Sequence, residues 1–311
     1  MGKTQDEIIR PEGTTLMHTE LPFVDCTDFI SDHSRLLEHS HQNGYLFFRG
    51  LLPVEPVLEL RRQVLRVAEQ HELLKPDTDP NAAIRRKGVF ICEQDRSEIF
   101  INFYVDVQKL RLFHALPHHE RIVSVLEVLF GSPVFIHPRH ICHAIFPGEH
   151  QYTTPPHQDF SPVRGSQETW TVWTPLGDCN TELGGLAIAR GSNRHGVLED
   201  GGVRSWELIE DSTEWAWNPF TCGDVLMFHS LTIHRGRDNM TENRIRLATS
   251  ARYQSVNEPV DEDALTVHLG CAKWEEVYSE WEVDDPLKYY WNAIDMNVQP
   301  AYHRRRTKPA S

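Results

Sequence analysis

Two short stretches of this 311-residue chain carry side chains of the kinds that bind transition metals. The first is Pro156-His157-Gln158-Asp159-Phe160, and the second, about seventy residues later, is 228–234, which contains two histidines. Side chains alternate between the faces of an extended strand, so His157 and Asp159 are predicted to point the same way. Together with a second histidine, they would form the 2-His-1-carboxylate face that binds non-haem Fe(II) and leaves positions open for substrate and O₂.

The His-x-Asp triplet alone is a weak signal, because a chain with 18 histidines contains such triplets by chance. Surface residues or hydrogen-bonded core residues remain an alternative interpretation of the triplet. His229 and His234 compete for the third ligand position. They are five residues apart, an odd number, so a continuous strand would place them on opposite faces.

A predicted strand with a candidate anion-binding residue follows the second stretch. Arg246 lies twelve residues after His234, in the alternating sequence 244–250 that is typical of a strand. A buried guanidinium needs an anion, and it binds a carboxylate through two parallel hydrogen bonds. An Fe(II) site beside such an arginine indicates an oxygenase that uses 2-oxoglutarate as co-substrate. Arg244 and Arg252 share the same strand face by parity and are the rival anchors.

The surrounding sequence predicts the elements that hold these residues. Apolar residues recur on one helical face after Pro53, and residues 116–130 form a second predicted helix that Gly131 caps. From residue 134 the pattern changes to short strands separated by Pro and Gly turns. They are expected over residues 134–136, 141–146, around His157, 169–174, 186–189, 225–228 and 245–253. This pattern of short strands and turns indicates a closed or sandwiched antiparallel sheet with the earlier helices packed outside it.

Several blocks, in order, carry a resemblance to a known family over roughly residues 40 to 255. They are 44–50, Phe146-Pro147-Gly148, His157-Gln158-Asp159, 173–176, Gly191-Ser192, Gly223-Asp224, His234, and Arg246 with Ser250. The chain resembles the phytanoyl-CoA dioxygenase family of Fe(II)/2-oxoglutarate-dependent oxygenases. The resemblance implies a mainly β double-stranded β-helix (jelly roll, cupin-like) with N-terminal and C-terminal helices.

The resemblance also implies roles for individual residues. His157, Asp159 and His234 match the metal ligands, which favours His234 over His229. Arg246 matches the anchor for the co-substrate 2-oxoglutarate. Trp173 matches a tryptophan that contacts this co-substrate, and Ser250 belongs to the same arginine block.

Some positions depart from the family pattern. Leu183 and Asn193 replace residues common in two family loops, Arg235-Gly236 replaces a common Gly-Ser, and Ile145 replaces a frequent lysine. These departures bear on the contacts around the co-substrate and on the substrate. Halogenating relatives carry a small residue where this chain has Asp159, so the carboxylate argues for hydroxylation, desaturation or a related oxidation.

Composition limits the possible partners and the compartment. The formal net charge of −14 argues against nucleic acid or an anionic membrane as a partner, because both need a concentrated basic surface. Six scattered cysteines without a C-x-x-C pair fit reduced thiols, and we expect a cytoplasmic protein. We find no signal-peptide core and no run of eighteen apolar residues. The basic cluster at 303–308 is expected to be a solvated tail.

The domain prediction has three parts. Residues 1–20 form a loosely ordered arm, residues 21–255 the oxygenase domain, and residues 256–311 a helical extension. In the extension, aromatic residues at helical spacing predict one helix over 274–281 and another over 285–294, with Asp285 as its N-cap. Such stripes must pack on the barrel, on another subunit of a homo-oligomer, or over the active-site mouth.

The sequence therefore predicts a dioxygenase that oxidises an unactivated C–H bond of a small or medium organic metabolite and releases succinate and CO₂. Two alternatives remain. Another metal-dependent cupin-like enzyme, such as an isomerase or hydrolase, would not need Arg246. A non-catalytic small-molecule-binding barrel would not need the intact set of ligands.

Overall fold

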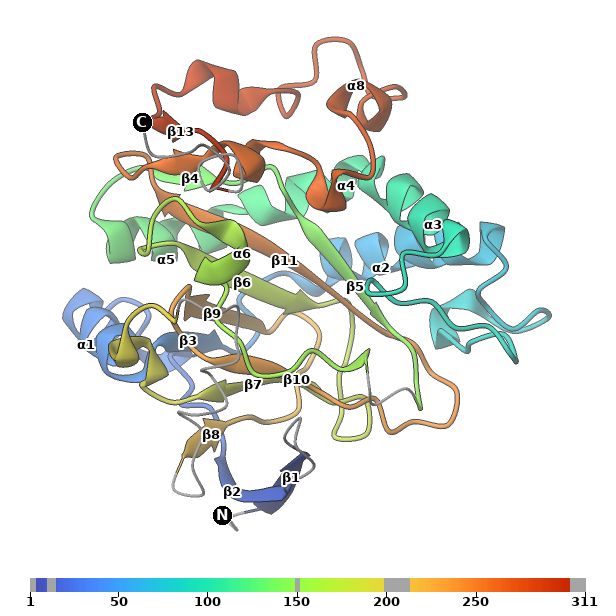
Figure 1. Cartoon of the computed structure of the whole chain (residues 1–311), viewed down its shortest axis with the longest axis horizontal. Coiled ribbons are helices and arrows are strands. Elements are labelled where there is room, and N and C mark those ends of the chain that lie inside the picture. The colour runs from blue at the N-terminus through green and yellow to red at the C-terminus, as the bar shows by residue number, and fades with distance from the viewer. Residues whose placement is uncertain (1–3, 10–14, 149–151, 199–212, 303–311) are drawn as a thin grey trace, which may run out of the picture.

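The computed structural model describes residues 4–9, 15–148, 152–198 and 213–302. Within these residues two main β-sheets form the centre of the molecule (Figure 1). The larger has the order β3-β9-β6-β11-β4, with β5 also paired to β11, and the smaller has the order β1-β2-β8-β7-β10. The strands of the larger sheet are β3 (Tyr45–Phe48), β4 (Val134–Ile136), β5 (Ile141–Ile145), β6 (Trp170–Pro175), β9 (Val225–His229) and β11 (Arg246–Ser255). Those of the smaller are β1 (Thr4–Ile9), β2 (Thr15–Leu21), β7 (Gly185–Ala189), β8 (Glu214–Ala216) and β10 (His234–Arg237).

Alternating side chains divide the core into two layers. In β3, Tyr45 and Phe47 pack between the sheets, whereas Leu46 and Phe48 join the layer beneath the helices. Trp173 likewise faces the inner layer and Trp170 the outer one. Two sheets packed in this way form the predicted double-stranded β-helix, and the fold prediction is confirmed.

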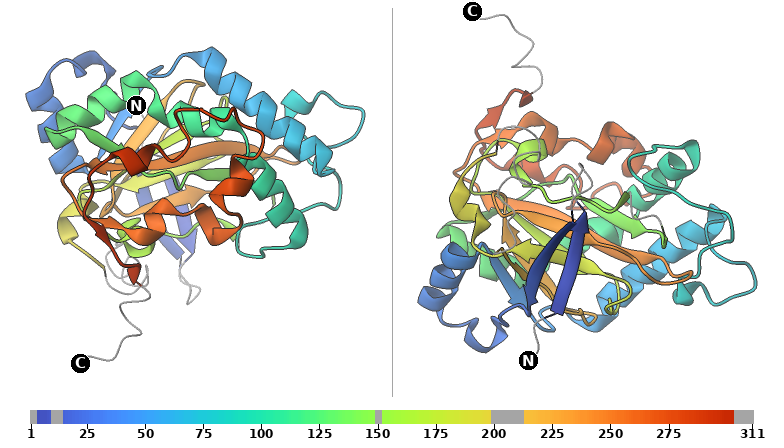
Figure 2. Two further views of the ribbon diagram at one scale, coloured as in Figure 1. Left: turned by 90° about the horizontal axis from the view of Figure 1, so that it is seen from above. Right: turned by 60° about the horizontal axis from the view of Figure 1, so that its bottom comes forward.

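Helices cover the outer face of the larger sheet, as the left view of Figure 2 shows. The predicted helix after Pro53 is α2, and its buried stripe from Val57 to Ala68 is as expected. The predicted helix over 116–130 begins only at Glu120, because Pro117 lies in a separate 3₁₀ turn before it. The covering helices are α1 (His33–Asn43), α2 (Val54–Gln70), α3 (Glu98–Gln108), α4 (Arg111–Ala115) and α5 (Glu120–Phe130). The sequence did not predict α1 or α3.

The N-terminal segment differs from its prediction. Instead of a loosely ordered arm, residues 4–9 and 15–21 form the antiparallel pair β1 and β2. Strand β2 then pairs in parallel with β8, where Leu21 is opposite Ala216. Backbone hydrogen bonds between strands hold this segment in place. The polar composition of the segment gave no indication of this pairing.

The C-terminal segment packs against the same chain, but its helices are much shorter than predicted. Helix α8 spans only Trp274–Val277, and the second predicted helix is reduced to the 3₁₀ turn η8 (Tyr290–Ala293). Tyr289 has a left-handed φ of 50°, which interrupts a helix at that point. Asp285 accepts a hydrogen bond from the backbone N–H of Leu287 in a local turn and caps no helix.

Aromatic side chains of this segment, among them Tyr278, Trp281 and Trp291, bury Phe135 of β4. A short parallel pair, β12 (Val260–Asp261) with β13 (Val298–Gln299), closes the segment. The basic cluster at 303–308 lies outside the described residues. None of the helices in the described ranges has the length and apolar character needed to cross a bilayer.

Candidate metal and co-substrate site

Two histidines and one carboxylate converge in the cavity between the sheets. One ligand atom from each of His157, Asp159 and His234 lies within 4.8 Å of the other two. Oδ1 of Asp159 is 3.6 Å from Nε2 of His157 and 3.8 Å from Nε2 of His234. This donor set fits a non-haem Fe(II) ion with one face left open.

The backbone places these ligands differently from the sequence prediction. His157 forms an isolated bridge with His234, with a 3.0 Å hydrogen bond from each backbone N–H to the other carbonyl. Asp159 has helical angles, φ −69° and ψ −23°, and directly precedes the short helix α6 (Phe160–Val163). The prediction of one extended strand through both residues was wrong, although their side chains do converge.

Hydrogen bonds fix which ring nitrogen of each histidine faces the cavity. Nδ1 of His157 lies 2.8 Å from the carbonyl oxygen of Pro155, and Nδ1 of His234 lies 3.1 Å from that of Thr232. Each Nδ1 therefore carries the proton and donates it, and each Nε2 presents a lone pair. Burial, reinforced by the neighbouring His157, lowers the pKa of His234 to about 3, which keeps its imidazole in the metal-binding form.

The two oxygens of Asp159 have separate partners. Oγ1 of Thr171 donates to Oδ2 over 2.5 Å, and Nη2 of Arg252 donates to Oδ1 over 3.3 Å. Burial alone would raise the pKa of this carboxyl, but Arg252 and the two histidines hold it well below its usual range. The carboxylate is therefore ionised and ready to bind a cation.

Arg246 is buried at the start of β11 and held by one edge of its guanidinium. Its Nη1 donates to three backbone carbonyls, those of Leu183 at 3.0 Å, Gly185 at 3.4 Å and Arg237 at 2.7 Å. Its Nε is buried without a partner among the described residues. Nε and Nη2 together form the edge that binds a carboxylate side-on.

Gly184 makes this placement possible. It has a left-handed φ of +85°, and a Cβ added to it would lie 2.6 Å from the carbonyl oxygen of Asp238 and 2.9 Å from Nη1 of Arg246. A side chain at this position would displace the arginine. The departure from the family pattern at Leu183 leaves this glycine intact.

The pairing register of β6 and β11 determines the order in which the site residues follow one another along these strands. Arg252 lies opposite Thr171, Ser250 opposite Trp173, and Arg246 lies four residues before Ser250. Trp173 and Ser250 thus line the cavity between the metal ligands and Arg246, and Oγ of Ser250 is 2.9 Å from Nε2 of His143. The cavity has a volume of about 970 Å³ including its open mouth.

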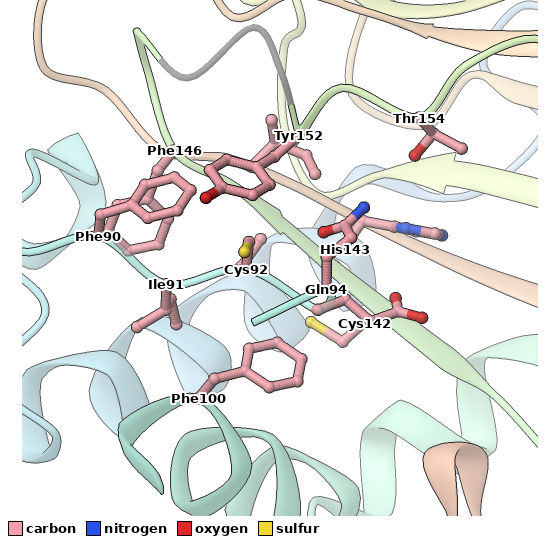
Figure 3. A pocket seen from close by; sticks show the side chains of 13 residues that line it. Phe90, Ile91, Cys92, Gln94, Phe100, Cys142, His143, Phe146, Tyr152 and Thr154 are labelled. Atoms are coloured by element: carbon pink, nitrogen blue, oxygen red, sulfur yellow. The ribbon is translucent and has the colours of Figure 1, made fainter. Parts of the chain in front are cut away.

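An aromatic pocket adjoins this cavity (Figure 3). The rings of Phe90 and Tyr152 stack with centroids 5.1 Å apart, and Phe146 meets Phe90 edge-on at 6.0 Å. The space around these side chains is about 530 Å³ including the open solvent at its mouth, and Gln94 and His143 lie on the walls of both spaces. An organic molecule bound here would extend from the metal ligands to an apolar surface.

Other predicted residues lie elsewhere. His229 faces the outer layer, where its ring packs against Trp170 and its Nε2 is 3.4 Å from Glu168. Sequence reasoning missed the contributions of Thr171 and His268, of the aromatic pocket, and of Arg252 beyond its role as a rival anchor. The alternation of side chains along residues 246–252 places Arg252 on the same strand face as Arg246, and this pattern could have identified Arg252 as a cavity residue.

Comparison with known proteins agrees with this geometry. A profile described as phytanoyl-CoA dioxygenase (PhyH) matches residues 40–248, well over half of the chain. The chain belongs to the phytanoyl-CoA dioxygenase family. Its cofactors are accordingly Fe(II) and the co-substrate 2-oxoglutarate, and it is an oxygenase that acts on small molecules.

Individual relatives are more distant. The 1-deoxypentalenic acid 11-beta-hydroxylase of Streptomyces exfoliatus is 26% identical over 272 residues, which cover 81% of this chain and 91% of that protein. The epimerase SnoN of nogalamycin biosynthesis, in complex with Fe³⁺ and alpha-ketoglutarate, superposes with a TM-score of 0.52 at 20% identity, over 74% of this chain and 86% of that one. The carbocyclase SnoK gives 0.51 at 16% identity, over 73% and 85% of the two chains. The two structural likenesses establish the jelly-roll fold.

Proposed function

We propose that this oxygenase hydroxylates an unactivated C–H bond of a small or medium organic metabolite. His157, Asp159 and His234 hold the iron, and Arg246 binds the distal carboxylate of 2-oxoglutarate. Trp173 and Ser250 line the path of the co-substrate. The observation that carries the proposal is the convergence of the three ligands in one cavity that Arg246, with its unpartnered Nε, also lines.

The chain's own residues supply positioning and charge. The bonds from both Nδ1 atoms aim the two imidazoles, and Thr171 orients the carboxylate of Asp159. The fixed guanidinium of Arg246 sets the direction in which the keto acid lies. Bound iron, together with 2-oxoglutarate and O₂, supplies the oxidising power, and succinate and CO₂ are released.

The carboxylate ligand, Asp159, supports hydroxylation. A carboxylate at position 159 occupies the place that halogenating relatives leave open for a halide. The hydroxylase relative from Streptomyces exfoliatus also favours this outcome. We therefore place hydroxylation ahead of desaturation and other oxidations.

The test is anaerobic addition of Fe(II) and 2-oxoglutarate to the purified protein. A visible metal-to-ligand charge-transfer band is expected, followed by slow succinate release when air is admitted. A cupin-like isomerase or hydrolase would bind the metal without this band. A non-catalytic barrel would give neither the band nor succinate.

We also propose that the enzyme works in the cytoplasm, where O₂ is available and thiols stay reduced. All six cysteines are free, and five of them are buried. Cell fractionation with an antibody against the native protein tests this placement. Recovery of the enzyme in an extracellular or membrane fraction would contradict it.

A further inference from the structure

A second buried arginine, Arg252, lies beside Asp159 and six residues beyond Arg246 on β11. Arg252 is paired with Thr171, and Thr171 holds Asp159, so Arg252 stands at the metal end of β11. Arg246 lies six residues away on the same strand, a separation of about 20 Å along the backbone. One keto acid that chelates the iron reaches towards Arg246 and leaves Arg252 free for another ligand.

The charge of Arg252 is poorly compensated. Its side chain is 8% exposed, and its Nε is buried with no partner in the described part of the chain. Its contact with an acid is one hydrogen bond of 3.3 Å to Oδ1 of Asp159. That oxygen is also the one nearest both Nε2 atoms, so a bound metal would draw its charge away from the arginine. A buried guanidinium in this position is stabilised by a further anion.

His268 adds a neutral donor to the same cavity wall. It belongs to the 3₁₀ turn η7 (His268–Gly270), beyond the part of the chain that the family profile matches. The hydroxyl of Tyr104 accepts from the backbone N–H of Cys142 at 3.4 Å and lies 2.7 Å from Nδ1 of His268. Nδ1 is the acceptor within reach of the hydroxyl hydrogen among the described residues, so we assign that hydrogen to Nδ1 and the ring proton of His268 to Nε2.

The remaining charges around this end are of both signs. Glu93 lies on the cavity wall, and the arginines that act on its carboxyl are Arg96, Arg252 and Arg139. Arg139 donates to the backbone carbonyl of Asp263 and to Oγ1 of Thr266, each over 2.8 Å. Two carboxylates, those of Glu93 and Asp159, lie near these arginines, and Asp263 also acts on Arg139. A bound divalent metal would make the balance of charge at this end positive, which an anionic ligand would offset.

We propose that Arg252 and His268 bind a carboxylate of the substrate, and that the apolar body of the substrate occupies the adjoining pocket of Phe90, Phe146 and Tyr152. Gln94 and His143, labelled in Figure 3, line both the pocket and the cavity, so one molecule could extend through the two adjoining spaces. This inference rests on the proposed function, because it names the substrate class of the same site. Its substrate is an apolar organic acid.

The test uses pairs of an acid and its primary amide on one apolar skeleton. Suitable pairs are 1-adamantanecarboxylate, cyclohexanecarboxylate and decanoate, each with its amide. The full chain is loaded with Mn(II) and with saturating N-oxalylglycine, which occupies Arg246 and cannot be oxidised. Binding of each probe is then measured by titration calorimetry, and the acid is expected to bind at least about tenfold more tightly than its amide in one or more pairs.

Variants assign this preference to the residues. Arg252→Gln should abolish it, Arg252→Lys should keep part of it, and His268→Leu should reduce it. Arg244→Gln, an exposed arginine of the same parity, is the matched control and should leave it unchanged. Failure of Arg252→Gln to fold would leave the wild-type comparison and His268→Leu as the test.

Two results overturn the proposal. One is equal binding of acid and amide by the wild-type protein in every pair, and the other is an acid preference that survives in Arg252→Gln. A loss of N-oxalylglycine binding in Arg252→Gln, with the acid preference intact, would instead assign this arginine to the co-substrate. The charge-transfer band is measured separately with Fe(II) and 2-oxoglutarate, so failure of the oxygenase assignment is distinguishable from failure of this one.

Discussion

Oγ1 of Thr171 lies 2.5 Å from Oδ2 of Asp159, so the sheet holds one oxygen of this carboxylate, while Oδ1 faces Arg252 and the Nε2 atoms of both histidines. Thr171 lies on β6, in the middle of the larger sheet, whereas Asp159 lies in the connection before α6. The hydrogen bond therefore ties the least regular part of the site to its most rigid part. A side chain that orients a ligand in this way belongs to the metal site as much as the ligand does.

Thr171→Val should weaken metal binding by about 10–100-fold, because the valine is nearly isosteric but cannot donate to Asp159. Titration of Mn(II) into the metal-free protein measures the change. Thr174→Val, a buried threonine of opposite parity on the same strand, is the matched control and should bind Mn(II) like the wild type. Equal Mn(II) affinities in the two variants would show that the hydrogen bond from Thr171 does not contribute to metal binding.

Replacement of His157, Asp159 or His234 by Ala should abolish the charge-transfer band and succinate release while the fold persists. His229→Ala should retain both, because its ring faces the outer layer beside Trp170. Activity lost in His229→Ala and kept in His234→Ala would reverse the ligand assignment.

Arg246→Ala should raise the concentration of 2-oxoglutarate needed for half-saturation, because the loss of a buried charged partner costs about 2–5 kcal/mol. Removal of the side chain also leaves three backbone carbonyls without their donor, so stability must be measured in parallel. Saturation curves for succinate release give the comparison. Arg244→Ala, exposed and outside β11, should match the wild type, and an unchanged curve for Arg246→Ala would move the anchor to Arg252.

The sequence predicted the sheet well because the sheet depends on local patterns, and the three residues proposed as ligands do converge in the structure. Strands were predicted over 134–136, 225–228 and 245–253, and β4, β9 and β11 lie at these positions. The three proposed ligands belong to the ordered blocks of the family pattern, although Asp159 has a helical backbone. Asp159 starts the turn into α6, where the backbone N–H of Phe160 donates to the carbonyl oxygen of Ser230, about seventy residues later, and the triplet alone does not encode this contact.

What the sequence missed depends on contacts between distant segments. His268 enters the cavity from a turn beyond the family match, and its tautomer depends on Tyr104, 164 residues earlier. Phe90 and Tyr152 meet only in the folded chain. The C-terminal helices were overpredicted because aromatic spacing fits a helix even where the left-handed backbone of Tyr289 interrupts it.

Acid should destabilise the protein through buried neutral histidines. Burial lowers the pKa of His114, His118 and His137 to about 4 each, and it lowers that of His140 well below its ordinary value of 6.5. Between pH 6.5 and about 4 the unfolded chain binds protons that the folded chain does not. The free energy of unfolding therefore falls as pH drops through this window, by about 1.4 kcal/mol per pH unit for each histidine.

His140→Phe tests this pH dependence, since both ring nitrogens of His140 are buried without partners in the described structure. Urea unfolding near pH 7 and near pH 5 should show a smaller loss of stability in the variant than in the wild type. The exposed His33→Gln is the control and should lose as much as the wild type. Equal losses in all three proteins would mean that His140 titrates normally in the fold.

Trp281 fixes the C-terminal segment to the helices α3 and α4 that cover the larger sheet. Its Nε1 donates to the backbone carbonyl of Lys109 over 2.7 Å, and its ring packs on Tyr278 and His114 at centroid distances of 4.7 and 5.4 Å. Trp281→Ala should lower the free energy of unfolding by about 3–5 kcal/mol, because it leaves a cavity and an unpaired carbonyl. Val283→Ala, two residues on and 93% exposed, should have almost no effect.

Unfolding curves and light scattering on these two variants separate the possible roles of the segment. Docking on the same chain predicts a large loss of stability with the native mass unchanged, and the intrachain contacts of Trp281 favour that result. A shift of Trp281→Ala to a smaller species would place the aromatic cluster at a subunit interface instead. Full stability in Trp281→Ala would contradict the packing described above.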